Sequence, residues 1–335
     1  MSTDTPDVAS ATRHTPTGLV LAVTSAVSFG LSGTLARGLM DAGWSSGAAV
    51  AVRVTLAALV LVIPGLWAVR GRTRLLLTHA RTIVIYGLSA VALAQLFYFM
   101  AVARLDVGVA LLIEYTAPVA VVLWMWSAHG QRPGRLTLAG AVVAAVGLVL
   151  LLDVLGAGEI DVVGIAFALI AMTGAATYFV MSADDTSGVP GITLAAGGLV
   201  VASAALWILA ALDVMPFRAT TSPVVFAMGS VPWWIPLLLL GLVTAALAYV
   251  TGIAAARHLG GRLASFVALS EVAAGLAFAW VLLDQAPKPM QLFGALLVLA
   301  GIVVVKLGER EVGSVGADEH LLVEPLPAQH PPHGR

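Results

Sequence analysis

The sequence contains no cysteine and few charged residues, and both deficits narrow the classes of protein to consider. Without cysteine, the chain forms no disulfide and holds no thiolate zinc site or iron–sulfur cluster. Charged residues make up 10% of the 335 positions, whereas soluble proteins usually carry about a quarter. The formal net charge of -1 gives no reason to expect a nucleic-acid partner. Hydrophobic residues make up 60% of the chain, and this predicts a polytopic membrane protein.

Long apolar runs follow one another along almost the whole chain. A helix that crosses a bilayer needs about 20 mostly apolar residues. By this criterion the sequence predicts ten membrane spans, at residues 17–36, 46–69, 82–103, 106–128, 135–153, 160–182, 190–212, 233–256, 260–283 and 289–307. The polar ends, 1–16 and 308–335, are predicted to be cytoplasmic tails, and the Pro-rich second one is expected to be disordered.

The distribution of basic residues predicts the orientation of the spans. Lys and Arg favour the cytoplasmic side of a membrane. With the N-terminus inside, twelve basic residues lie in cytoplasmic segments and four in outer ones. Both termini are therefore predicted to be cytoplasmic. Arg53 belongs to neither group because it lies inside the second predicted span.

The two halves of the chain resemble each other at one fixed offset. A shift of 154 positions pairs Gly87 with Gly241, Trp126 with Trp280, Gln131 with Gln285, Pro133 with Pro287, Gly140 with Gly294 and Gly147 with Gly301. Each repeat contains five spans, and an odd number requires the two copies to enter the membrane in opposite orientations. The predicted fold is therefore an all-α polytopic membrane protein with ten transmembrane helices arranged as two inverted five-helix repeats. Inverted repeats are typical of secondary transporters, whose substrate sites lie at the repeat interface.

Two segments carry a resemblance to a known family. They are "AQLFYFMAVARLDVGVALLIEYTAPVAVVLW" and "GGRLASFVALSEVAAGLAFAWVLLDQ", each followed by a helix with glycines seven positions apart. They resemble the EamA-type ten-helix transporters of the drug/metabolite transporter superfamily, with one repeat at 17–153 and the other at 160–307. "IEYTAPV" looks most like the threonine/homoserine-exporter branch, which implies export of amino acids or related metabolites through the plasma membrane. Gln131 and Gln285 stand where many members carry a glutamate.

Several polar residues lie deep inside predicted spans and are the candidate site. Ionisable groups in the hydrocarbon region are costly and normally face the bundle interior or a wet cavity. The candidates for a substrate or ion pathway are Arg53, Gln95, Tyr98, Glu114, Pro118 and Glu271. At a rise of 1.5 Å per residue, Arg53, Gln95 and Glu114 share a layer roughly 10–12 Å beneath the outer surface. Pro118 lacks the N–H that would bond the carbonyl of residue 114 and so leaves a free acceptor there.

Two interpretations of this layer are open. In one, Arg53 and Glu114 flank the outward half of the pathway and bind the carboxylate and the amine of a substrate. In the other they form a static ion pair. Glu271, nearer the midplane, either carries a proton between the two faces or forms a structural hydrogen bond to a neighbouring backbone group. Serines of the first span (Ser25, Ser28, Ser32) and polar residues of the sixth (Thr173, Thr177, Tyr178) are second-rank candidates.

Other classes of protein fit the sequence less well. A membrane-embedded transferase would need clustered acidic pairs or a nucleophile with its base, and a receptor usually brings a large soluble domain. The sequence has no ATP-binding motif, and we expect no metal, no cofactor and no enzyme activity. The expected partners are a small-molecule substrate and the lipid bilayer, with the chain as a monomer or homodimer. Multidrug or cationic-compound efflux is the main alternative to amino-acid export.

Overall fold

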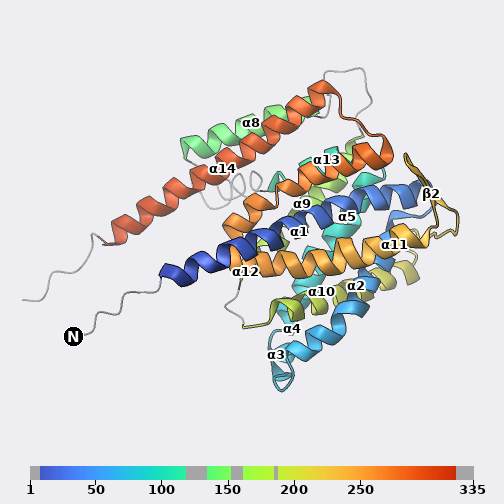
Figure 1. Cartoon of the computed structure of the whole chain (residues 1–335), viewed down its shortest axis with the longest axis horizontal. Coiled ribbons are helices and arrows are strands. Elements are labelled where there is room, and N and C mark those ends of the chain that lie inside the picture. The colour runs from blue at the N-terminus through green and yellow to red at the C-terminus, as the bar shows by residue number, and fades with distance from the viewer. Residues whose placement is uncertain (1–7, 118–133, 152–160, 185–187, 322–335) are drawn as a thin grey trace, which may run out of the picture.

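The computed structural model describes residues 8–117, 134–151, 161–184 and 188–321 (Figure 1). Pro118, Trp126 and Gln131 lie outside the described residues. The first repeat contains α1 (Val8–Asp41), α2 (Ser46–Ala68), α3 (Arg74–Thr78), α4 (Ala80–Ile85), the π-helix η1 (Tyr86–Leu93), α5 (Ala94–Val102), α6 (Val107–Glu114) and α8 (Arg135–Leu151). The second contains α9 (Val162–Ala183), α10 (Gly191–Ala211), β1 (Val224–Phe226), β2 (Gly229–Val231), α11 (Trp234–Gly241), the π-helix η2 (Leu242–Leu247), α12 (Ala248–Val267), α13 (Ser270–Leu283) and α14 (Pro289–Leu321).

The described part of the chain is almost entirely helical and apolar enough to cross a membrane many times. Six helical stretches are long and apolar enough to span by themselves, the first being Pro16–Asp41 and the last Trp234–Leu259. Three shorter apolar helices, in α8, α13 and α14, add to them. The chain is an all-α polytopic membrane protein, as its composition predicts.

Two π-helices occupy corresponding places in the two repeats. A shift of 154 positions from the end of η1, Leu93, arrives at the end of η2, Leu247. A π-helix inserts an extra residue into a helical turn, and such turns occur often at functional sites. Each of them interrupts a predicted span, the third and the eighth, so the two repeats share this irregularity as well as their sequence pattern.

Helices of one repeat pack mainly against helices of the other. In the bundle, α1 lies against α12 and α13, while its counterpart α9 lies against η1, α5 and α6 (Figure 1). Helices α2 and α10 pack together, and α8 and α14 form a pair along one edge. The core therefore sits at the interface between the repeats.

Glycines bring α8 and α14 into direct backbone contact. A Cβ atom at Gly140 would lie 2.6 Å from the backbone nitrogen of Val305, and one at Gly301 would lie 2.5 Å from that of Ala144. Small residues permit such close approach between membrane helices. The glycines spaced seven positions apart therefore permit the close packing of α8 against α14.

A β-hairpin lies at the end of the bundle away from the N-terminus. Strands β1 and β2 pair antiparallel, and Val224 of β1 is fully buried. The backbone N–H of Ala227 at the turn donates to the carbonyl of Leu282 at the end of α13, at 2.8 Å. The segment between the seventh and eighth spans is thus folded onto the bundle.

Several helix boundaries differ from the sequence prediction, among them the end of α6 at Glu114, inside the predicted span 106–128. Helix α12 runs without interruption through the expected loop at 257–259, and the helix first breaks at Ala268 and Leu269. Helix α1 begins at Val8, inside the expected tail. Helix α14 continues to Leu321, past the expected end at 307, since the sequence has no proline between Pro289 and Pro325 to stop it.

Candidate functional site

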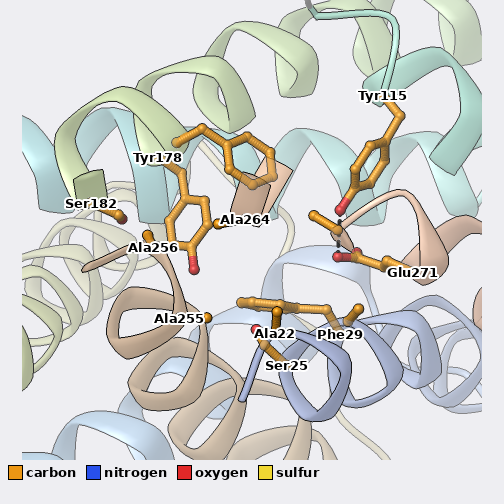
Figure 2. Close-up of a pocket in the computed structure, with 14 residues that line it drawn as sticks. Ala22, Ser25, Phe29, Tyr115, Tyr178, Ser182, Ala255, Ala256, Ala264 and Glu271 are labelled. Atoms are coloured by element: carbon orange, nitrogen blue, oxygen red, sulfur yellow. Dashed lines mark hydrogen bonds between the residues drawn. The ribbon is translucent and has the colours of Figure 1, made fainter. Parts of the chain in front are cut away.

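A small, partly open cavity lies between the two repeats (Figure 2). Residues of α1, α9, α12 and α13 line it, together with Tyr115, which follows α6. Of the residues that line the cavity, Ala22 lies near the start of the apolar stretch Pro16–Asp41, while Ser182 and Ala256 lie at or near the ends of the stretches Val162–Ser182 and Trp234–Leu259. The cavity therefore occupies the half of the molecule nearer the N-terminus.

Glu271 is the acidic group of this cavity. The Tyr115 hydroxyl donates to Glu271 Oε2 at 2.6 Å, a bond that joins one repeat to the other (Figure 2). Glu271 lies in the first turn of α13, after the break at residues 268–269, where the helix dipole favours a negative charge. A second break follows Glu114 in the first repeat, where residues 115–116 form a turn. Each repeat therefore has an interrupted helix beside a carboxylate, which is how transporter sites are commonly built.

Aromatic rings form one side of the cavity. The ring centroid of Phe29 lies 6.1 Å from that of Tyr178 and 5.2 Å from that of Tyr249, and both pairs meet edge to face. Tyr178 and Tyr249 are 5.6 Å apart in the same geometry. Of these three, Phe29 and Tyr178 line the cavity, and Tyr249 lies behind them. Such rings present flat apolar surfaces and attract cations over their faces.

Behind this aromatic cluster lies a fully buried guanidinium group. Arg53, with no exposed surface, donates from Nη1 to the side-chain oxygen of Gln95 and from Nη2 to the backbone carbonyl of Thr244 in η2. Its Cζ atom lies 5.3 Å from the ring centroid of Phe99. Among the described residues Arg53 Nε has no hydrogen-bond partner. Burial of a charge is tolerated when it is hydrogen-bonded, and η2 supplies one of the acceptors that Arg53 uses.

The predicted site residues come together only in part. Arg53 and Gln95 are bonded directly, and Gln95 Nε2 also donates to the Tyr249 hydroxyl at 3.4 Å. Tyr98 is buried, and its hydroxyl has no partner among the described residues. Glu114, half-buried at the end of α6, interacts electrostatically with Arg53 and Glu271. The ion pairs of the described residues include Arg37–Asp41 and Arg104–Asp161, whereas Arg53 and Glu114 form no ion pair with each other there.

Some residues of the site were not among the main candidates predicted from the sequence. Tyr249 lies 154 positions from Gln95, so the repeat offset itself pointed to it. Ser25, a second-rank candidate, lines the cavity and donates to the carbonyl of Ala248 at 2.9 Å. Phe29 and Tyr115 gave no signal, because aromatic residues in apolar helices are ordinary core residues.

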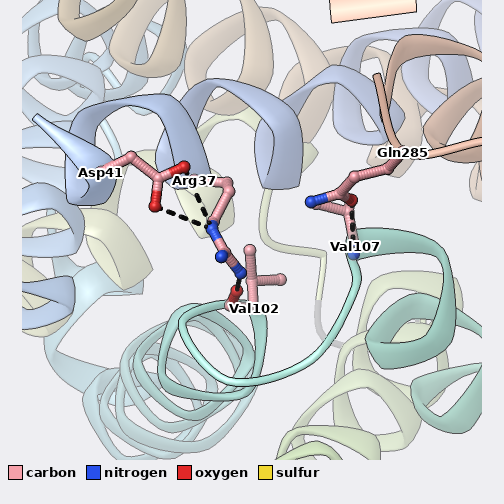
Figure 3. Close-up of polar contacts among 5 residues, drawn as sticks. All are labelled: Arg37, Asp41, Val102, Val107 and Gln285. Carbon is pink, nitrogen blue, oxygen red and sulfur yellow. Dashed lines mark hydrogen bonds and ion pairs between the residues drawn. The ribbon is translucent and has the colours of Figure 1, made fainter. Parts of the chain in front are cut away.

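The opposite end of the bundle is held together by polar contacts (Figure 3). Arg37 of α1 pairs with Asp41 and donates from Nη1 to the carbonyl of Val102 at 3.0 Å. The side-chain oxygen of Gln285 accepts from the backbone N–H of Val107, at 3.3 Å, and so ties the chain after α13 to the start of α6. An amide performs this task without a charge.

A salt bridge between the repeats lies at the same end. Arg104 Nη1 donates to Asp161 Oδ2 at 3.0 Å, while Asp161 Oδ1 accepts from the backbone N–H of Gly164 at 2.8 Å and caps α9. The Gly164 amide first, and Arg104 next, hold the pKa of the Asp161 carboxyl below its ordinary value. Asp161 therefore stays ionised over the whole physiological range.

Comparisons with known proteins agree with this architecture. A search among curated proteins found no match. A solved crystal structure of a protein is 21% identical, with a TM-score of 0.57, and the similarity covers 88% of this chain and 98% of the other, which shows a common fold. The sequence model of the EamA-like transporter family matches the chain twice, at residues 16–153 and 162–307. With two copies of this repeat facing each other around the cavity, the chain belongs to the EamA-like transporter family, within the drug/metabolite transporter superfamily.

Proposed function

We propose that this protein is a secondary transporter that exports amino acids or related small metabolites by alternating access. The main support for this proposal is the cavity between the repeats, which lies in the half of the bundle nearer the N-terminus and has Glu271 and Tyr115 on its wall. Basic residues predict that this end faces the cytoplasm, so the cavity would load substrate from inside the cell. A plasma-membrane location and cytoplasmic termini belong to the same proposal.

The chemistry of the cavity suits a substrate amine. Glu271 is the one carboxylate among the described residues that line it, and the Tyr115 hydroxyl orients it. A carboxylate in a cavity with aromatic walls attracts an ammonium group by charge and by cation–π contact. Arg53 lies beyond the aromatic cluster, and its guanidinium group suits the carboxylate of an amino acid. The threonine/homoserine-exporter branch stays a prediction from the sequence.

Glu271 also offers a means of coupling transport to a gradient. A carboxylate that binds either a proton or a substrate ammonium group, but not both, exchanges one for the other across the membrane. The alternative is a purely structural role, in which Glu271 holds Tyr115 and with it the end of α6. Transport by a Glu271→Gln variant that still responded to the proton gradient would rule out the coupling role.

An efflux assay tests the proposed function. Cells that overproduce the protein are loaded with a panel of amino acids, and the rate of release is compared with that of cells with an empty vector. We expect faster release of at least one amino acid, and loss of this release in Glu271→Gln and in Glu114→Gln. Asp213→Asn is a matched control, because it removes a carboxylate from an exposed turn, and Asn accepts the positive φ of 56° found there. Release equal to the empty vector for every compound would refute the proposal.

Efflux of bulky organic cations is the second candidate. The aromatic wall of Phe29, Tyr178 and Phe179 and the single carboxylate of the cavity favour it. If only cationic dyes or quaternary ammonium compounds were released, this candidate would replace amino-acid export. Zwitterionic substrates, by contrast, should need Arg53 as well as Glu271.

A further inference from the structure

The internal symmetry of the fold extends to individual contacts. A Cβ atom at Gly18 of α1 would meet Leu259 and His258, and one at Gly164 of α9 would meet Leu105 and Arg104. Gly18 and Gly164 are 146 positions apart, and both pairs of contact residues are 154 apart. The same contact is therefore made twice, once in each half of the membrane. Gln95 and Tyr249, also 154 apart, bond to each other at the centre.

Applied to the residues that line the observed cavity, these two offsets identify corresponding residues in the opposite half of the molecule. Tyr178 of α9 corresponds to Ser32 of α1 by the shift of 146 positions. By the shift of 154 positions, Gly252 corresponds to Tyr98, Ala256 to Val102, Ala264 to Ala110 and Ala268 to Glu114. All the starting residues line the observed cavity. Their counterparts come from α1, α5 and α6, which meet near the end of the bundle that carries the hairpin.

We propose that Ser32, Tyr98, Ala110 and Glu114 line a second cavity, closed in this structure, that binds the ammonium group of the substrate on the outer side. It is the counterpart of the observed cavity and opens when that cavity closes. The proposal rests on the proposed function, since a secondary transporter has to present its site to both faces in turn.

Two unsatisfied hydroxyl groups support this assignment. Ser32 is 2% exposed and Tyr98 is 4% exposed, and neither hydroxyl has a hydrogen-bond partner among the described residues. Buried polar groups are nearly always hydrogen-bonded, so each exception needs an explanation. Both occur at positions that the symmetry assigns to the second cavity. An open state in which water or a substrate bonds to them supplies the missing partners.

The structure also shows what keeps this region closed. Tyr98 fills the space beside Gly33, where a Cβ atom would lie 2.4 Å from its hydroxyl oxygen. Arg37 bonds the carbonyl of Val102, the counterpart of a cavity-lining residue, and Gln285 bonds the N–H of Val107 (Figure 3). These two bonds join helices of different parts of the bundle across the expected opening. Both have to break before the second cavity can open.

The class of ligand follows from the carboxylates. The observed cavity contains Glu271, whose counterpart in the first repeat is Ala117. The second would contain Glu114, whose counterpart, Ala268, is apolar. Each cavity thus carries one acid, and the two acids lie about one helical turn apart when the repeats are superimposed. An ammonium group that leaves one carboxylate therefore finds another in the opposite cavity, while an anion would be repelled in both.

The absence of cysteine allows a direct test by thiol labelling, since single-cysteine variants need no other change. Ser32→Cys and Ala110→Cys are treated from outside intact cells with a membrane-impermeant methanethiosulfonate during efflux. Ser222→Cys, in the exposed outer segment, gives the rate for a free thiol, and Ala202→Cys, fully buried in α10, gives the background. A minor state is commonly populated at about 0.1–10%, so we expect labelling at about that fraction of the Ser222→Cys rate. Ala202→Cys should stay unlabelled.

The charge of the reagent tests the ligand class. Relative to Ser222→Cys, the cationic reagent should react faster than the anionic one at residues 32 and 110, and Glu114→Gln should remove this preference. If both variants export substrate yet label no faster than Ala202→Cys, the second cavity does not exist as assigned. A preference for the anionic reagent would overturn the ligand class. Failure of the proposed function looks different, because the wild-type protein would then export nothing, whatever the labelling of the Ser32→Cys variant.

Discussion

Replacement of Gln95 by leucine isolates the interaction that keeps Arg53 buried. Leucine is close to glutamine in size but has no acceptor, so Arg53 Nη1 would lose its partner while the bond to the Thr244 carbonyl remained. The change also removes the bond between Gln95 and the Tyr249 hydroxyl, which at 3.4 Å is long. Loss of the Arg53–Gln95 bond leaves a charged donor without access to water, whereas loss of the Gln95–Tyr249 bond removes only a weak bond between neutral groups.

The structure sets the size of the effect. A hydrogen bond to a charged group contributes about 1.5–3 kcal/mol, and a neutral one about 0.5–1.5 kcal/mol. Since Gln95 itself is half-buried, we expect Gln95→Leu to lower the free energy of unfolding by about 2 kcal/mol. Tyr249→Phe removes only the long bond and should cost about 0.5 kcal/mol. Gln95→Glu keeps an acceptor beside the guanidinium group and should be no less stable than the wild-type protein.

Unfolding of the purified protein in micelles, titrated with SDS, measures these differences. A cost for Gln95→Leu no larger than that of Tyr249→Phe would show that Gln95 does not hold the Arg53 guanidinium. A Gln95→Glu variant as unstable as Gln95→Leu would lead to the same conclusion.

Three further predictions concern the packing, the cavity and the outer end of the bundle. Gly147→Ala would place a Cβ atom 2.6 Å from the backbone of α14 and should lower the free energy of unfolding by about 1–3 kcal/mol. Val146→Ala, at an exposed position, is the control and should change the free energy of unfolding little in the same assay. Tyr115→Phe removes a hydrogen bond of about 1.5–3 kcal/mol to the Glu271 carboxylate and should raise the substrate concentration for half-maximal efflux about tenfold to a hundredfold. An unchanged value would mean that Tyr115 does not orient the carboxylate. Folding lowers the pKa of the Asp161 carboxyl. The ionised carboxylate therefore stabilises the folded state at pH values above its ordinary pKa of 3.8, and this stabilisation is lost as the pH falls through the lowered pKa of the folded state. Melting temperatures of the wild-type protein and Asp161→Asn should therefore converge in acid, and a difference that grew as the pH fell would contradict this assignment.

The sequence by itself determined the class of protein and the plan of the fold. Apolar runs of the length of a bilayer predicted membrane spans, and one offset of 154 positions predicted two repeats. An odd number of spans in each repeat then required their inversion. These features are readable because hydropathy and repetition are properties of the chain taken in order. They also placed Arg53 and Gln95 at the same depth, and the structure joins them by a hydrogen bond.

Only the tertiary structure decided which side chains meet and where the cavity lies. Depth along a span does not specify the rotation of a helix about its own axis, so the sequence could not tell whether Arg53 faces Glu114 or Gln95 and Thr244. That rotation depends on contacts between helices far apart in sequence, such as the approach of Gly18 to Leu259. The aromatic wall and the Tyr115–Glu271 bond arise in the same way, because they exist only once helices of both repeats are packed together.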